Sequence, residues 1–230
     1  MGDTPSWLQS GIDADLGAES AGRSSDTANN RFWMPKGESR KIIFLSSGAA
    51  DTGDVATVFE HQLNIYKNWR NWNTCLEPTG VECPICKFQK EHNQFKRYKG
   101  MFFSIIDTTE FTDKSGNTRK NLKKILCAKR GTAEILKRKY LSRFESDETL
   151  RGAMFKVYRT PDDKSPSVGE DFEFIKTVDL AGFEDSEPHN WEEILRPDPE
   201  AVNRSMTQLR TERGLDDDSP FDSDSGKVVY

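Results

Sequence analysis

Short apolar runs separated by turn residues dominate the middle of the chain. The stretch RKIIFLS, residues 40–46, has the length and composition of a buried strand. Residues 101–129 predict a long hairpin, because β-branched and aromatic residues in MFFSIIDTTEF precede the turn cluster DKSGN. The returning strand alternates between two faces, one carrying Leu122, Lys124 and Leu126 and the other Lys123, Ile125 and Cys127.

The following segments predict one helix and then two strands. Residues 131–144 have helical spacing, with Thr132 as a candidate N-cap and an apolar stripe of Ile135, Leu136, Tyr140 and Leu141. Residues 152–159 and 170–180 alternate apolar and polar positions, as strands do. After residue 185, the sequence PDPEAVNRSMTQLRTERG shows a weaker helical pattern.

These segments predict a mainly β fold with some α. About five strands, one late helix and a cysteine-rich insertion near residues 60–95 fit a Greek-key β-barrel of the oligonucleotide-binding type, the OB-fold, although periodicity alone also fits a generic α+β domain. The expected divisions are a flexible acidic N-terminal arm at 1–30 with a short docking segment at SWLQSGI, an OB-fold core at 31–185, a C-terminal helical segment at 186–213 and a disordered acidic tail at 214–230.

Charge is distributed very unevenly along the 230 residues. The net charge of −5 divides into −4 over residues 1–30, +11 over 31–160 and −12 over 161–230. A basic centre between acidic ends is typical of a body that binds a polyanion. A solvated surface whose charges segregate by chance would give such a contrast less often.

Several classes of protein are disfavoured by what the sequence lacks. It has no apolar run of eighteen residues and no signal-peptide pattern, so we expect an intracellular protein with reduced cysteines and no membrane partner. It has no Walker loop, GxGxxG, HExxH or nucleophile elbow, and its acidic residues in the basic centre are scattered singly. We therefore expect a protein that is not an enzyme.

The stretch CLEPTGVECPICKFQKEH, residues 75–92, contains three of the four cysteines. Cys83 and Cys86 form a Cys-x-x-Cys turn, which presents two sulfurs to one tetrahedral ion, and Cys75 supplies a third. A disulfide is disfavoured in a reducing compartment, and a thioredoxin-like redox pair has no use for a third cysteine. From spacing alone, the candidates for a fourth ligand are His61, His92 and Cys127.

Zinc is the expected ion for a set of thiolates and imidazole. Four protein ligands leave no position for water, so we expect one structural Zn²⁺ rather than a hydrolytic centre. Such an ion contributes on the order of 10 kcal/mol to the folding of its subdomain. An insertion with few apolar residues of its own needs a stabilising contribution of this kind.

The arrangement of these residues resembles the zinc-binding subdomain of the T4-type bacteriophage single-stranded DNA-binding proteins. The resemblance rests on His61, Cys75, Cys83 and Cys86 at their observed spacing, with WNTC before the first sulfur and CPICKF at the knuckle. It extends over roughly residues 31–185 through IIFLSS, YKGMFFSIID, GNTRKNLKKI, GAMFKVYR and FEFIKTVDL, in that order. Family members begin with a basic segment, whereas residues 1–30 are acidic here, and the last residues, GKVVY, depart from a purely acidic end.

This resemblance implies a function and a set of partners. It favours His61 as the fourth zinc ligand and an OB-fold core that coats single-stranded DNA during phage DNA replication, recombination and repair. It also implies contacts of the acidic C-terminal tail with phage replication and recombination proteins, in the cytoplasm of the infected bacterial host.

Cationic and aromatic residues interleave in the basic centre, as binding of single strands requires. Cations neutralise phosphates, and flat rings stack on unpaired bases. The alternatives are a buried position for some rings, above all among Phe102 and Phe103, and packing of Trp72 against the zinc subdomain. The candidate DNA-binding residues are Tyr66, Lys67, Trp69, Arg70, Trp72, Arg97, Tyr98, Lys99, Phe102, Lys120, Lys123, Lys124, Lys129, Arg130, Lys137 and Arg138.

Two other binding functions compete with this one. A zinc-ribbon adaptor that binds protein would carry the basic surface incidentally and would bind oligonucleotides weakly. A duplex binder would need a recognition helix with polar base-reading side chains, and none stands out.

Overall fold

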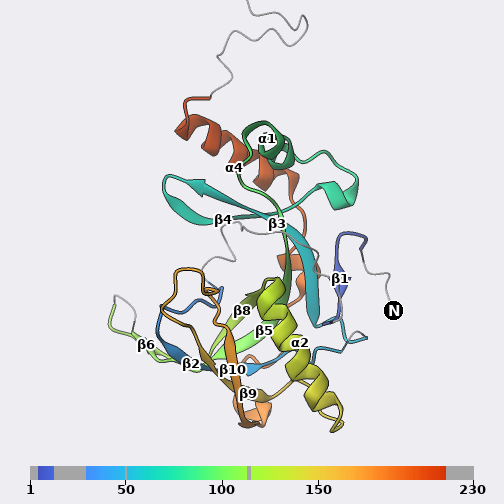
Figure 1. Ribbon diagram of the computed structural model, residues 1–230, viewed down its shortest axis with the longest axis vertical. Coiled ribbons are helices and arrows are strands. Elements are labelled where there is room, and N and C mark those ends of the chain that lie inside the picture. Colours follow the sequence, from blue (N-terminus) through green and yellow to red (C-terminus); the bar gives the residue numbers. More distant parts are fainter. Residues whose placement is uncertain (1–4, 13–29, 50, 113–114, 216–230) are drawn as a thin grey trace, which may run out of the picture.

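An antiparallel sheet of eight strands organises the chain in the computed structural model, which describes residues 5–12, 30–49, 51–112 and 115–215 (Figure 1). Its path runs β1-β3-β5-β2-β9-β10, with β4 beside β3 and β8 beside β5. The strands are β1 (Gln9–Ser10), β2 (Ser39–Phe44), β3 (Val55–Ile65), β4 (Asn68–Thr74), β5 (Tyr98–Asp107), β8 (Leu122–Ala128), β9 (Ala153–Tyr158) and β10 (Asp171–Thr177); β6 (Phe111–Thr112) and β7 (Thr118–Arg119) form a separate small ribbon.

Four α-helices and two short 3-10 turns complete the described part of the chain. Pro199 stands at the first helical position of α4 and Asp198 caps it, accepting from the backbone amides of Glu200 and Ala201. The elements are the turn Glu77–Thr79, α1 (Pro84–His92), α2 (Arg130–Phe144), the turn Leu180–Gly182, α3 (Trp191–Ile194) and α4 (Pro199–Glu212). None of the helices in these ranges is long and apolar enough to span a bilayer.

The mainly β fold with some helix is confirmed. Strand β5 is its centre, since it pairs with β3, β2 and β8. Within the described ranges no strand pairing joins β8 to β10, so the sheet is not a closed barrel. A single parallel bridge from Arg31 to Ile125 extends the sheet at the edge of β8.

The predicted strands and helix all form, with boundaries moved by one to a few residues. The expectation for Thr132 is wrong: α2 begins earlier, its N-cap position is Lys129, and no side chain caps it. Thr132 is instead buried and donates its hydroxyl to the carbonyl of Gly169 at 3.5 Å. The helical segment at 186–213 divides into α3 and α4.

The two faces of the sheet carry separate hydrophobic cores. On one face, Phe44 packs edge-to-face against Phe103 and Phe155, each at 5.6 Å between ring centroids, and α2 covers them. On the other face, Tyr98, Phe102, Ile125 and Cys127 pack against Trp191 and Leu195. The alternation predicted for β8 is confirmed, because Leu126 belongs to the first core and Ile125 and Cys127 to the second.

Part of the expected N-terminal arm belongs to the folded body. Gln9 and Ser10 pair with Thr57 and Ala56 of β3, and the neighbouring Leu8 and Ile12 are buried. The strand at Gln9–Ser10 agrees with the docking segment expected at SWLQSGI, so a flexible arm does not extend over residues 5–12. The disorder expected for the rest of the arm and for the acidic tail concerns residues 1–4, 13–29 and 216–230, which lie outside the described residues.

His189, in the segment before α3, contacts Ser104 of β5, and its pKa predicts a pH effect on stability. Its Nδ1 lies 2.9 Å from Ser104 Oγ, and burial, together with the charge of Lys123, lowers its pKa to about 4. Because the folded-state pKa lies below the unfolded value near 6.5, the unfolded state binds more protons between these values. The stabilisation is complete above pH 6.5 and is lost as the pH falls towards 4.

We expect the free energy of unfolding of wild-type protein to fall by about 1–2 kcal/mol more than that of His189→Asn over this interval, allowing for solvent screening. Urea denaturation at a series of pH values measures the difference. Parallel pH profiles for the two proteins would show that His189 does not titrate on unfolding.

Candidate functional site

Four residues converge in a buried cluster whose ligand atoms all lie within 4.8 Å of one another: His61, Cys75, Cys83 and Cys86. The nitrogen Nε2 of His61 lies 3.3 Å from Cys86 Sγ and 3.6 Å from Cys83 Sγ. Cys75 Sγ and Cys86 Sγ are 3.5 Å apart, and all of the cysteines are free thiols. The cluster is therefore a set of separate ligands and not a disulfide.

Local structure explains how residues far apart in sequence meet here. His61 lies in the middle of β3, and the two-residue turn Tyr66–Lys67, with positive φ at both residues, reverses the chain into β4. Cys75 directly follows β4. Cys83 is the N-cap residue of α1, so Cys86 lies in its first turn, where the helix dipole favours thiolates.

The spacing of these atoms fits a tetrahedral zinc ion. With Zn–S near 2.3 Å and Zn–N near 2.0–2.1 Å, tetrahedral angles give about 3.8 Å between sulfurs and about 3.5 Å from sulfur to nitrogen. The observed 3.5 Å and 3.3–3.6 Å are close to these values. The buried His/Cys₃ group could hold one metal ion, consistent with a structural zinc.

A second hydrogen bond fixes the orientation of the histidine ring. Nδ1 of His61 lies 3.1 Å from the carbonyl oxygen of Phe95, to which it donates when Nε2 is the ligand. Phe95 itself has a φ of 56°. The segment after α1 thus supplies the backbone carbonyl that accepts a hydrogen bond from the ring of His61. Metal-bound histidines typically have such a partner on the second ring nitrogen.

The other two candidates for the fourth ligand lie elsewhere. His92 is exposed at the end of α1, with its ring against Phe88 at 4.2 Å between centroids. Cys127 is buried in the core beneath Tyr98. Sequence spacing did not distinguish among His61, His92 and Cys127 as the fourth ligand. Among the described residues, the structure brings only His61 of these three to the clustered sulfurs.

Proton affinities in the cluster show strong mutual coupling. Burial opposes protonation of His61, but hydrogen bonds and charge from Cys75 and Cys83 outweigh burial and raise its pKa to about 9. Hydrogen bonds from Cys75 and Cys86 lower the pKa of Cys83, whereas hydrogen bonds with Cys75 and Cys83, together with burial, raise the pKa of Cys86. A divalent cation replaces the shared protons, so its affinity is expected to decrease as the pH falls.

The insertion around the cluster shares its core with the C-terminal helix. The cysteines pack with Leu63, Ile65, Ile85 and Phe88, and α4 adds Val202, Met206 and Leu209 to the same core. Figure 1 shows α1 and α4 together at one end of the molecule, beyond the β3–β4 hairpin. The subdomain around the His/Cys₃ cluster therefore consists of residues 60–95 together with α4.

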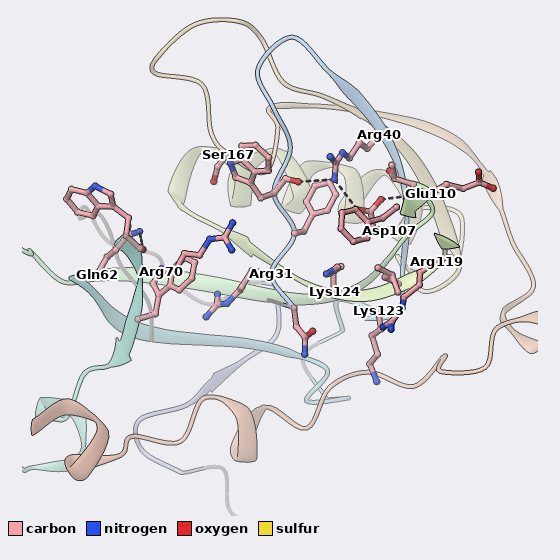
Figure 2. Close-up of a pocket in the computed structure, with 18 residues that line it drawn as sticks. Arg31, Arg40, Gln62, Arg70, Asp107, Glu110, Arg119, Lys123, Lys124 and Ser167 are labelled. Carbon is pink, nitrogen blue, oxygen red and sulfur yellow. Dashed lines mark hydrogen bonds and ion pairs between the residues drawn. The ribbon is translucent and has the colours of Figure 1, made fainter. Parts of the chain in front are cut away.

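A groove of about 970 Å³ lies beside the hairpin, and Figure 2 shows its lining. Arg70 and Gln62 project from the β3–β4 hairpin on one side, and Lys123, Lys124 and Arg119 lie on the other. Six basic and five aromatic side chains contribute, including three tryptophans. The full lining is Asn30, Arg31, Phe32, Trp33, Arg40, Gln62, Trp69, Arg70, Trp72, Asp107, Thr109, Glu110, Phe111, Arg119, Leu122, Lys123, Lys124 and Ser167.

Five of the candidate DNA-binding residues meet in this groove, namely Trp69, Arg70, Trp72, Lys123 and Lys124. Tyr98 and Phe102 are 0 % exposed, so their assignment as stacking surfaces is wrong: the alternation of β5 turns both rings into the core. Outside the groove lining lie Tyr66 and Lys67 at the hairpin turn, Lys99 on β5, Lys120 before β8, and Lys129, Arg130, Lys137 and Arg138 at or within α2.

Arg97 belongs to the metal centre and not to the groove. Its guanidinium pairs with Glu77 at 2.5 Å and lies 3.9 Å from Cys75 Sγ. It also covers the ring of Phe59 at 4.7 Å. A positive charge at this position offsets the negative charge of the thiolates.

Several groove residues were missed from the sequence. Trp33 is 54 % exposed, close to the 53 % of Trp69, and stands with Arg31 in RFWMPKG. The mixture of basic and aromatic residues in that segment was the available signal. Arg40 comes from β2, where it pairs with Asp107 at 3.3 Å and donates to the carbonyl of Trp33.

Not all of the groove's positive charge is open to a ligand. Lys123 pairs with Asp185 at 2.7 Å. Burial lowers the pKa of Lys124, and the nearby charge of Arg40 acts in the same direction, while Asp107 opposes them. The acidic lining residues Asp107 and Glu110 also reduce the net potential. Crowding of like charges in a partly buried groove favours an incoming anion.

No protein-family model matches this chain, and a search of curated proteins finds no match.

Metal content tests the centre directly. We expect about one Zn²⁺ per wild-type chain, and loss of the ion in Cys83→Ser and in Cys86→Ser, because a serine hydroxyl is a poor zinc ligand. The melting temperature should fall with the metal, since binding contributes several kcal/mol to folding. Elemental analysis and thermal unfolding of the purified proteins measure both effects.

Cys127→Ser is the matched control, because Cys127 is equally buried but lies outside the cluster. It should retain the full metal content despite some loss of stability. A metal-free Cys127→Ser protein, or a metal-loaded Cys86→Ser protein, would contradict the assignment of ligands.

Proposed function

We propose that this chain is a sequence-nonspecific single-stranded DNA-binding protein with one structural zinc. The observation that carries the proposal is the groove between the β3–β4 hairpin and β8, which places basic side chains such as Arg70 and Arg119 beside three tryptophans, Trp33, Trp69 and Trp72. Cations along a groove neutralise phosphates, and exposed rings stack on bases regardless of their identity. Bases paired in a duplex keep their faces covered, so such a groove favours single strands.

The zinc ion has a structural role in this proposal. Its four protein ligands leave no coordination position for water or substrate. The ion instead holds the middle of β3 against α1 and so fixes the hairpin that forms one wall of the groove. We propose accordingly that the protein is not an enzyme.

We also propose a more specific fold, biological process and location, on the basis of the sequence resemblance. They are an OB-fold for the body, action in phage DNA replication, recombination and repair, and a place in the cytoplasm of the infected host. The acidic tail at 214–230 would contact phage replication and recombination proteins. The net charge of +11 over residues 31–160 supports a body that binds a polyanion, and the five aspartates and one lysine of residues 214–230 support an acidic tail.

A protein-binding adaptor is the second candidate, and one surface favours it. Four apolar side chains on α2 and β10 are exposed: Leu141, Phe144, Phe174 and Ile175. The elements α2 and β10 contact each other, and exposed apolar groups on neighbouring elements are typical of protein contacts. This surface is separate from the groove, so an adaptor would leave the three groove tryptophans without a role.

Tryptophan fluorescence distinguishes the two functions. Three of the five tryptophans line the groove, so we expect oligo(dT) to quench the emission strongly and duplex DNA of equal length to quench it little. Affinity should fall steeply with salt, with a log–log slope of about −3 to −4 if ~4–5 phosphates are neutralised. Equal, weak responses to strand and duplex would favour the adaptor.

Two adjacent positions separate the phosphate contribution from the base contribution. Arg70→Gln should reduce the magnitude of the salt slope by about 0.7, the value for one phosphate on a single strand. Trp69→Ala should leave the slope unchanged and weaken binding by about 1–3 kcal/mol per lost base stack. Titrations with oligo(dT) at several salt concentrations give both quantities.

Arg138→Gln is the control for charge alone, since Arg138 is an exposed cation of α2 outside the groove. It should change neither slope nor affinity appreciably. A slope change in Arg138→Gln as large as that in Arg70→Gln would place phosphates on α2 and oppose the groove as the binding site.

A further inference from the structure

A buried ion pair lies beneath one wall of the groove. Nη2 of Arg31 donates to Oε1 of Glu60 at 2.9 Å, and the two side chains are only 2 % and 3 % exposed. The hydroxyl of Tyr98 donates to the other carboxylate oxygen of Glu60 at 2.5 Å. Burying such a pair costs desolvation free energy, and apolar residues of similar volume often give equal or greater stability. Stability alone is therefore a weak explanation for this pair.

The guanidinium of Arg31 also lies over two aromatic rings. Its central carbon is 4.7 Å from the ring centroid of Phe102 and 5.5 Å from that of Trp72. Phe102 is part of the core, whereas Trp72 lines the groove. Because a guanidinium is planar, the hydrogen bond to Glu60 fixes a flat surface against the indole.

Strand geometry makes this arrangement independent of the metal ligands. Glu60 is adjacent to His61 on β3, so their side chains point to opposite faces. Trp72 pairs with Gln62 and therefore shares the face of Glu60. The ion pair and the indole thus belong to the groove side of the hairpin, and the metal ligand belongs to the other.

We propose that Glu60 and Arg31 are positioning residues for Trp72: the buried pair holds the indole in the orientation that stacks on a base, and Arg31 itself does not contact nucleic acid. This inference rests on the proposed function and names Trp72 as a stacking residue. With a side chain 2 % exposed, Arg31 offers almost no surface to a phosphate. Its action is to restrict the rotation of the ring before a base arrives, which reduces the entropy lost on binding.

Arg31→Lys is the most direct test, because lysine keeps the positive charge beside Glu60 but has no flat face. We expect the affinity for oligo(dT) to fall about fivefold or more, because the base stack on Trp72 is weakened, with an unchanged salt slope. In a Trp72→Ala background the same substitution should have little further effect. This non-additivity is the result that a general loss of stability would not produce.

Arg143→Lys is the matched control. Arg143 is also a buried arginine that pairs with a glutamate, Glu148 at 2.9 Å, and covers an aromatic ring, Phe174 at 4.4 Å. It lies on α2 and outside the groove lining, so its replacement should leave affinity for oligo(dT) unchanged. A loss equal to that of Arg31→Lys would attribute the effect to weakened packing and overturn the proposal.

Three other results would also overturn it: no loss of affinity in Arg31→Lys, an equal loss in the Trp72→Ala background, or, in Arg31→Gln, a salt slope reduced by about 0.7, which would indicate a direct phosphate contact. If Arg31→Lys does not fold, Glu60→Gln decides, since it keeps the size and an acceptor for Tyr98 while removing the charge. Glu60→Gln must also weaken binding in the wild-type background and have little further effect in the Trp72→Ala background. Wild-type protein that fails to bind oligo(dT) would reject the proposed function itself, whereas binding without coupling would reject only this inference.

Discussion

The alternation of side chains along β3 is the constraint on which both sites depend. Successive residues of a strand point to opposite faces, and here the two faces serve different purposes. His61 and Leu63 lie on the face of the metal cluster and the helices around it. On the opposite face, Gln62 lines the groove and Glu60 is buried against Arg31. A shift of one residue in the pairing of β3 with β4 would exchange these faces and remove the ligand and the groove wall together.

The elements close in sequence were predictable from local pattern. The β8 alternation, α2 and the Cys-x-x-Cys turn all follow from the spacing of a few neighbouring residues. The choice among His61, His92 and Cys127 depends on how β3 lies against α1, which no local spacing determines. The same limit explains Tyr98 and Trp33, two aromatic residues beside basic ones that look alike in sequence. Tyr98 is buried because it lies in the paired strand β5, whereas Trp33 lies outside the strands and is exposed.

The charge of the groove was likewise predictable from the sequence only in part. The concentration of positive charge in the centre of the chain was visible from residue counts, and it predicted a polyanion ligand. The partners that reduce this charge were not visible, because Asp185 reaches Lys123 and Asp107 reaches Arg40 across long stretches of sequence. The groove is consequently less positive than its basic residues alone suggest.

The contribution of α4 to the core around the His/Cys₃ cluster has a consequence for the order in which the protein folds. During synthesis the four ligands leave the ribosome long before Val202, Met206 and Leu209, which complete the core around them. Until those residues arrive, the insertion has an apolar surface open to solvent, and its native contacts span more than a hundred residues of chain. Such non-local contacts form slowly. The end of the molecule that carries the His/Cys₃ cluster is therefore expected to be completed last, whereas the body around β5 can assemble first.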